Sequence, residues 1–297
     1  MKKFVGKSLI GVLLVALLCG TVVWLSEREP FRTRLAVIFD CTDFCDESGM
    51  DPVYEKAQTP NDCTTLIIGD SVCRQIYTGI EKDFSDATEI ASNAATMITG
   101  QYALLMDYLD NHPDTKTVYF MMHPMSLTRT FDADWSYRYS VMVNVEHKNM
   151  SRLDESTRKK IKGMYGALFV QPAVVNIIEK SPIARKLYLT YIHNNVPAME
   201  LSNRYELADL YVMKMYEECR ARGIEFYLLP TPVTEHYKPQ CDVMAEEDKD
   251  TKMYEIFPDY YNDIYYFPDE WSDDLTHFSG DHAKKKFLKT LRMDEFR

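Results

Sequence analysis

The stretch TTLIIGDSVCRQIYTGI, residues Thr64 to Ile80, decides the fold class. Its first half is a short, apolar, β-prone run that ends at Gly69, which is typical of a buried parallel strand. Its second half begins at Ser71 and repeats apolar residues at helical spacing, at Cys73, Ile76, Tyr77 and Ile80. A strand that turns directly into a helix predicts an α/β fold with a parallel sheet.

The same alternation of strand and helix continues along the chain. We therefore expect an α/β domain over residues 63–297, a flavodoxin-like three-layer sandwich with about five parallel strands. The further predicted strands are Thr88–Ala91, Thr117–Met122, Glu225–Leu229 and Asp263–Phe267, and the predicted helices are Thr96–Asn111, Asn203–Arg222 and a closing Asp281–Leu291.

Residues 125–200 interrupt this alternation. The segment is rich in Tyr, Met and basic residues and is predicted to be mostly helical, with breaks at Pro172 and Pro182. It is predicted to be a helical insertion that serves as a lid or docking surface, or as a flank that completes the core.

The N-terminus predicts a membrane anchor. Ser8 to Leu25 contains no charged residue, and its length approaches the roughly 20 residues of a transmembrane helix. Lysines precede it, so we expect a cytoplasmic stub and transmembrane helix at residues 1–27, contact with the lipid bilayer through residues 8–25, and a domain outside the cell membrane. Residues 28–62 are predicted to be an irregular stalk. The alternative is a cleaved signal peptide, but the apolar run is long and no small-residue cleavage site follows it.

Charge and cysteine content restrict the partners and the compartment. The chain has 34 Lys+Arg against 45 Asp+Glu, a net charge of −11, so no nucleic-acid partner is expected. Six of the seven cysteines follow the predicted span and permit disulfides in an oxidising compartment, without indicating which residues pair. Cys73 lies on the apolar face of its helix and is expected in the core.

Two separated motifs suggest catalytic chemistry. Ser71 follows a strand, at the sheet edge where open α/β sheets bind ligands, and the start of a helix supplies N–H groups for an oxyanion. A serine needs a base to remove its proton and a carboxylate to orient that base. The segment DDLTH contains Asp274 and His277 three residues apart, after the last predicted strand and therefore at the same edge.

These motifs resemble the blocks of the SGNH/GDSL hydrolases. GDSV at Gly69–Val72 is similar to the first block, and Asp274-x-x-His277 is similar to the last. The resemblance implies that Ser71 is the nucleophile, that His277 is the general base and acid, and that Asp274 orients it. No metal or cofactor is expected, because CTDFC at Cys41–Cys45 is followed by no second Cys/His pair of matching spacing. The anchor followed by the Ser block is most similar to membrane-tethered envelope members, which include the D-alanine transfer protein of the teichoic-acid system and polysaccharide O-acetyl transferases and esterases.

The oxyanion blocks of this family are incomplete in the chain. Where the family has a Gly block, the chain reads SNAA at 92–95, and where the family has an Asn, it has His123 followed by a proline. We expect the backbone N–H of Ser71 and the amide of Asn93 to form the oxyanion hole. His123 either contacts substrate or only ends a strand, and Arg74 with Gln75 either contacts an anionic substrate or lies on a solvated helix face.

The sequence therefore favours a membrane-anchored, extracytoplasmic serine esterase or O-acyltransferase that acts on cell-envelope polysaccharide through an acyl-serine intermediate. The alternative is a non-catalytic SGNH-like protein that binds polysaccharide or assists a multispan acyltransferase in the membrane. In that case Ser71 would serve only as a helix cap. Asp281 and His282 are a second candidate pair for the relay, but they lie inside the predicted closing helix.

Overall fold

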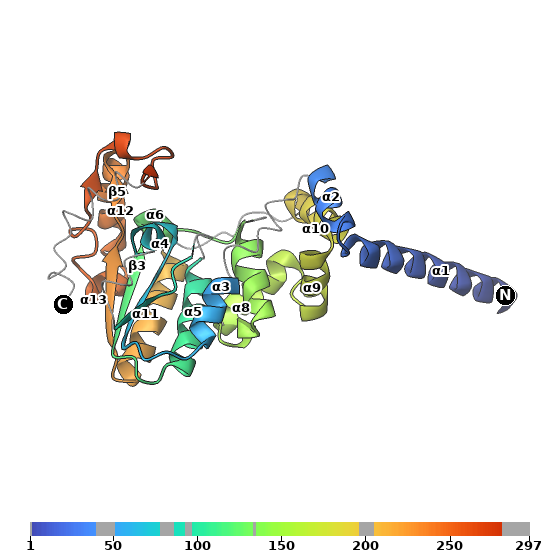
Figure 1. Ribbon diagram of the computed structural model, residues 1–297, viewed down its shortest axis with the longest axis horizontal. Helices are drawn as coiled ribbons and strands as arrows, with labels where there is room; N and C mark the ends of the chain where they lie inside the picture. Colours follow the sequence, from blue (N-terminus) through green and yellow to red (C-terminus); the bar gives the residue numbers. More distant parts are fainter. Residues whose placement is uncertain are drawn as a thin grey trace. The chain divides into compact units, whose positions relative to one another are not determined.

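The computed structural model describes residues 2–39, 51–77, 86–92, 97–132, 135–195 and 205–280. The chain forms two compact units. Residues 1–47 and 131–198 make up a helical unit, and residues 48–130 and 199–297 make up an α/β unit (Figure 1).

A parallel sheet organises the α/β unit. Its four strands lie in the order β2-β1-β3-β4, and every pair is parallel. This confirms the predicted α/β class and the parallel sheet. In the register, Gly69 at the end of β1 lies level with Met121 near the end of β3. The strands are β1 (Thr65–Gly69), β2 (Ala87–Glu89), β3 (Thr117–Met122) and β4 (Glu225–Pro230).

Helix α4 (Ser71–Tyr77) packs on one face of this sheet. Its apolar side chains join Ile67 and Met121 of the strands, and Phe267 and Phe278 from the end of the chain, in one buried cluster. Cys73 is fully buried in this cluster, as predicted. The cluster connects the helix that begins at Ser71 with the segment that carries His277.

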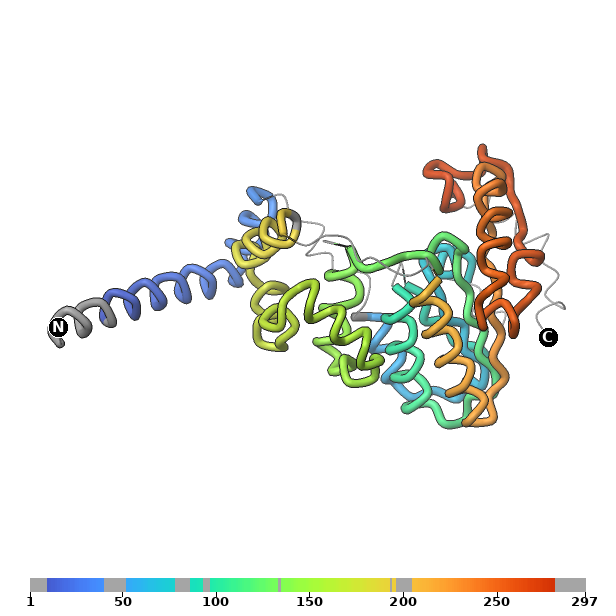
Figure 2. Tube along the Cα trace, turned by 180° about the vertical axis from the view of Figure 1, so that it is seen from behind, coloured from blue at the N-terminus to red at the C-terminus, as the bar shows by residue number. Residues whose placement is uncertain are grey.

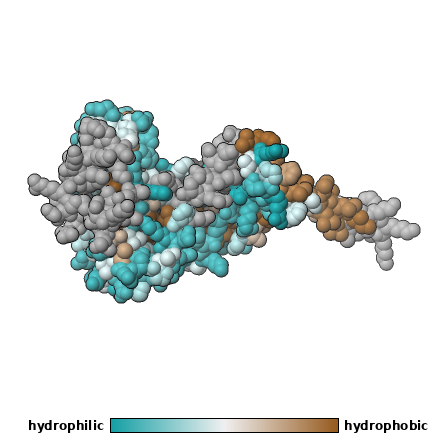
Figure 3. Space-filling model, in the orientation of Figure 1, coloured by the Kyte–Doolittle hydropathy of each residue, from teal (hydrophilic) through white to brown (hydrophobic). Residues whose placement is uncertain are grey.

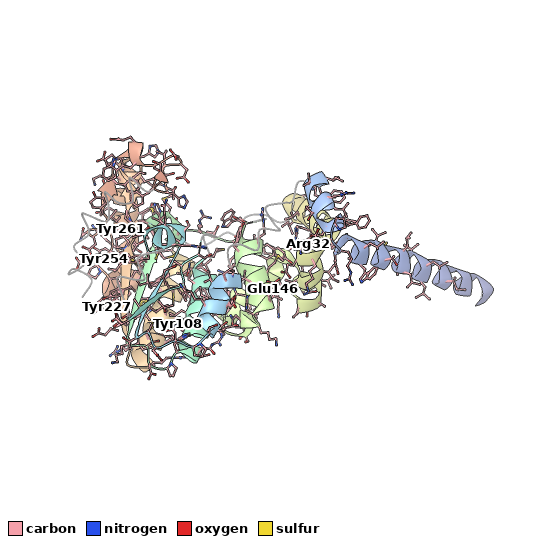
Figure 4. The ribbon with its side chains drawn as sticks, viewed as in Figure 1. Arg32, Tyr108, Glu146, Tyr227, Tyr254 and Tyr261 are labelled. Atoms are coloured by element: carbon pink, nitrogen blue, oxygen red, sulfur yellow. The ribbon has the colours of Figure 1, made fainter. Side chains whose placement is uncertain are left out.

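Helices α5 (Ile98–Asn111) and α11 (Glu206–Ala221) pack against each other and contact β1 and β4, respectively. Tyr108 of α5, labelled in Figure 4, stacks on His112, the residue that follows the helix, with 3.8 Å between the ring centroids. Helix α3 (Asp51–Gln58) packs on α5 and buries Tyr54 and Ala57 completely.

Helix α3 and its neighbour correct the prediction of an irregular stalk over residues 28–62. Helix α2 (Phe31–Ile38) lies near the start of that segment, and α3 (Asp51–Gln58) lies near its end. Pro52 lies in the first turn of α3, where proline is favoured because the N–H it lacks has no partner there.

The predicted fifth strand is also corrected. Only Tyr266–Phe267 (β6) is extended, and it pairs with β5 (Val233–Thr234) in a separate two-stranded parallel sheet. Pro268 follows β6 directly and lacks the N–H that would extend the ladder. Phe267 is buried and stacks on Phe278, 4.3 Å between centroids.

The unit also contains α6 (Pro124–Leu127), α12 (Lys238–Asp248) and α13 (Lys252–Ile256), with 3₁₀ turns at Glu235–Tyr237 and Asp269–Trp271.

The insertion is helical, as predicted, and its helical unit begins at residue 131 rather than 125. Tyr137, Tyr165 and Tyr188 form its aromatic core, with Tyr137 4.4 Å from Tyr188 and 5.3 Å from Tyr165 between centroids. The prolines predicted as breaks stand at the starts of the last two helices. The elements are a π-helical segment Tyr137–Met142, α7 (Val143–Glu146), a 3₁₀ turn Asn149–Ser151, α8 (Glu155–Tyr165), α9 (Pro172–Lys180) and α10 (Pro182–Asn195).

The same unit contains helix α1 (Lys2–Ser26). Helix α10 contacts α1 and α2, and both ribbon and tube show α2 beside α10 (Figures 1 and 2). Ser26 Oγ lies 2.6 Å from Ser181 Oγ in a buried hydrogen bond. This contact joins the end of α1 to the start of α10.

Apolar side chains of α1 are exposed, and they form a brown band in Figure 3. Among the described residues no single helix is both long and apolar enough to span a membrane, whereas Ile10–Ser26 and Phe31–Ile38, bent by 98° to each other, are so as a pair.

Five described cysteines are free thiols, and Cys41 and Cys45 lie outside the described residues, as does the predicted closing helix.

Candidate active site

The corner between β1 and α4 is held by Asp70, a residue to which the sequence analysis gave no role. Its buried carboxylate accepts hydrogen bonds from the N–H groups of Val72 (3.1 Å) and Cys73 (3.3 Å), which caps α4. The other oxygen accepts the N–H of His123 (2.8 Å) and the hydroxyl of Ser126 (2.9 Å). One side chain therefore joins the ends of β1 and β3. An Asp before a helix start was the available signal.

Gly69 is required at this corner by close packing. A Cβ built on Gly69 would clash with the carbonyl oxygen of Met121 and lie 2.7 Å from Cys73 Cβ. The glycine therefore lets β3 and α4 approach the end of β1, which places Ser71 beside the sheet edge.

Ser71, His277 and Asp274 form a continuous hydrogen-bonded relay. Ser71 Oγ lies 2.8 Å from His277 Nε2, and His277 Nδ1 lies 2.7 Å from Asp274 Oδ2. An ionised carboxylate only accepts, so Nδ1 carries the proton and donates to Asp274. Nε2 then presents a lone pair to the Ser71 hydroxyl. The structure thus brings together the three residues that the sequence analysis proposed as a triad.

The Asp274 carboxylate is positioned by the turn in which it lies. Its Oδ1 accepts the N–H groups of Thr276 (2.9 Å) and His277 (2.7 Å). Burial alone would raise the pKa of Asp274, but the hydrogen bonds from the His277 backbone and ring and from Thr276 outweigh it and lower the pKa to about 2. Asp274 is therefore ionised at neutral pH.

The backbone of this turn adopts an uncommon conformation at Leu275. Its φ is +63°, in the left-handed region that costs a side-chain-bearing residue about 1–3 kcal/mol. The hydroxyl of buried Thr234 donates to the Leu275 carbonyl at 2.8 Å. Ser272 and Phe278 form a β-bridge across the base of the turn. These contacts hold the strained turn and, with it, the carboxylate and imidazole.

Gln75 connects the two halves of the relay. It lies one turn after Ser71 on α4, and its Nε2 donates to the Phe278 carbonyl (2.6 Å) while its Oε1 accepts the Phe278 N–H (2.8 Å). The side chain therefore fixes the backbone next to His277. The sequence predicts contact of Gln75 with an anionic substrate or a place on a solvated helix face, and its two hydrogen bonds to Phe278 correct this prediction.

The other predicted site residues have different positions. His123 is buried at the end of β3, where its Nδ1 accepts the Met125 N–H at 3.3 Å and caps α6. Arg74 is half-buried on α4, and among the described residues its side chain has no hydrogen-bond or ion-pair partner. Asn93, and the alternative pair Asp281 and His282, lie outside the described residues.

The fold and the site define a class of arrangement: an α/β unit with a Ser–His–Asp relay at the carboxyl edge of a parallel sheet. No known protein family, curated protein or solved structure matches this chain.

Proposed function

We propose that the protein is a serine esterase or O-acyltransferase of the SGNH/GDSL type. The observation that carries the proposal is the relay, in which 2.8 Å separates Ser71 Oγ from His277 Nε2 and 2.7 Å separates His277 Nδ1 from Asp274 Oδ2. These distances lie within the range at which a base takes a proton from a nucleophile. The His277 and Asp274 side chains are 38% and 55% exposed, so a substrate reaches the relay from solvent.

The proposed reaction has two steps. Ser71 Oγ attacks the carbonyl carbon of an ester while His277 Nε2 takes the hydroxyl proton, and the carbonyl oxygen becomes an oxyanion. When the ester C–O bond breaks, His277 returns the proton to the leaving alcohol, and an acyl-Ser71 remains. Water or a sugar hydroxyl then attacks this acyl group, with His277 as base, which regenerates Ser71. Asp274 stays ionised throughout and stabilises the imidazolium.

The location of the enzyme is part of the proposal. Helix α1 exposes apolar side chains, and the Arg28 guanidinium lies 4.8 Å from the centroid of the Trp24 ring near its end, an aromatic position suited to a membrane interface. We infer a single-pass cell-membrane anchor through residues 8–25 and an extracytoplasmic α/β unit. The substrate would then be an acyl ester of cell-envelope polysaccharide. The sheet order β2-β1-β3-β4 supports a flavodoxin-like sandwich.

Covalent labelling tests the proposal. The full chain in detergent should react with a fluorophosphonate at Ser71 and hydrolyse p-nitrophenyl acetate, and Ser71→Ala should abolish both. Ser156→Ala is the matched control, because Ser156 also lies in the first turn of a helix, and its hydroxyl donates to Asp154 in the same turn. Its labelling should equal that of the wild type. Wild-type protein that is unlabelled and inert would refute catalysis and favour the alternative, a non-catalytic protein that binds polysaccharide or assists a membrane acyltransferase.

A further inference from the structure

His123 lies at the same sheet edge as Ser71. Gly69 is level with Met121 in the parallel ladder, and Ser71 and His123 each follow two residues later in the chain, just beyond the ends of β1 and β3. The His123 N–H donates to Asp70 Oδ2 at 2.8 Å, and Asp70 is the residue directly before Ser71. This hydrogen bond joins the ends of β1 and β3. The backbone of His123 is therefore fixed beside the nucleophile.

The protonation of the His123 ring follows from its contacts. Nδ1 accepts the N–H of Met125 at 3.3 Å, so Nδ1 has no proton and the neutral ring carries its proton on Nε2. Burial, the largest cause, lowers the pKa of His123; Asp70 raises it, and the charges of His277 and Arg129 lower it further. The ring is therefore a neutral donor at neutral pH, and a positive charge on His277 makes protonation of His123 less favourable.

The Nε2–H group of this ring has no acceptor among the residues that the structure describes. His123 is 3% exposed, and its Nε2 is a buried polar atom without a hydrogen-bond partner in that part of the chain. Buried donors are nearly always satisfied, because an unmade hydrogen bond is costly. A buried donor left open at the sheet edge that carries the nucleophile is suited to an acceptor that is present only when substrate reacts.

We propose that His123 Nε2–H donates a hydrogen bond to the carbonyl oxygen of the acyl group as it becomes an oxyanion on Ser71. This inference rests on the proposed function and makes His123 a catalytic residue. A neutral donor fits this role, because a second positive charge would oppose the imidazolium that forms at His277 during attack.

Two substitutions separate this role from the capping role of the ring. In His123→Asn, the amide oxygen replaces Nδ1 as the acceptor for Met125 N–H, but no atom replaces Nε2. In His123→Gln, the longer amide places an N–H near the Nε2 position. We expect His123→Asn to fold and to lose about 100- to 1000-fold in kcat for p-nitrophenyl acetate with KM little changed, and His123→Gln to recover part of that loss.

The results distinguish this inference from the proposed function. If the wild type is active and His123→Asn, folded by circular dichroism, retains kcat within about three-fold, the assignment of His123 is wrong and the relay stands. If the wild type is inert, the proposed function itself fails.

A second measurement applies even if the variant unfolds. In the full-length wild-type chain labelled with ¹⁵N-histidine, the His123 Nε2–H proton should shift downfield when Ser71 is phosphonylated, because the phosphoryl oxygen occupies the oxyanion position. An unchanged resonance would overturn the proposal.

Discussion

Gln75→Ala tests whether the clamp between α4 and the His277 segment maintains the relay. The substitution removes two partly buried hydrogen bonds, to the carbonyl and the N–H of Phe278. Each is worth about 0.5–1.5 kcal/mol net, so the docked segment loses roughly 1–3 kcal/mol. If that energy holds His277 in reach of Ser71, kcat should fall by about 5- to 150-fold, at 1.36 kcal/mol for each factor of ten.

The assay is steady-state hydrolysis of p-nitrophenyl acetate, together with the rate of fluorophosphonate labelling. Gln75→Glu should be as impaired as the alanine variant, because its carboxylate repels the Phe278 carbonyl that Gln75 contacts as donor. Gln58→Ala is the control: it loses a hydrogen bond to Asp107 on another helix pair of the same unit and should keep full activity. An alanine variant at Gln75 with kcat within two-fold of the wild type would refute the reasoning.

Three further predictions follow from described contacts. Asp274→Asn should lower kcat by roughly 10³–10⁴-fold, because the carboxylate orients His277. Lowering the pH should not restore fluorophosphonate labelling of the variant, and a kcat equal to that of the wild type would contradict the prediction. Gly69→Ala should lower the free energy of unfolding by several kcal/mol in urea titrations, because the added Cβ clashes with the carbonyl oxygen of Met121. Unchanged stability would show that β1 and β3 can move apart to accept the methyl group. Burial raises the pKa of Asp248 to about 6, so the folded state holds that proton more tightly and stability falls as pH rises from about 4 through 6. Asp248→Asn should therefore exceed the wild type in stability by up to about 3 kcal/mol at pH 8 and converge with it near pH 4, and a pH-independent difference would contradict this.

The central strands were predictable because their signal is local. Thr117–Met122 has the predicted bounds, since a continuous apolar run has few other structures available to it between helices. Residues Asp263–Phe267 carry an equally β-prone run, yet only its last two residues pair, and they pair with a strand outside the main sheet. Pairing depends on distant partners, and composition alone does not show which edge a short strand will meet.

The same distinction holds for the site. Ser71, Asp274 and His277 were recognisable because their chemistry is coupled and each stands in a short motif. The link that Asp70 makes to the end of β3 and the role of Gln75 were not, because the backbone groups involved, of His123 and Phe278, lie 53 and 203 residues away. Nearly every residue type has a backbone N–H and a carbonyl, so the sequence does not show which residue will provide them as hydrogen-bond partners.

The contact between α1 and the helical unit affects how a soluble fragment should be designed. Deleting residues 1–27 removes an apolar helix, but it also leaves Ser181 without its buried partner Ser26 and uncovers the part of α10 that contacts α1. Such a truncation would remove the exposed apolar surface of α1 but expose the surface of α10 that α1 covers, and the fragment would be prone to self-association. Preparing the intact chain in detergent or a lipid nanodisc keeps that face covered.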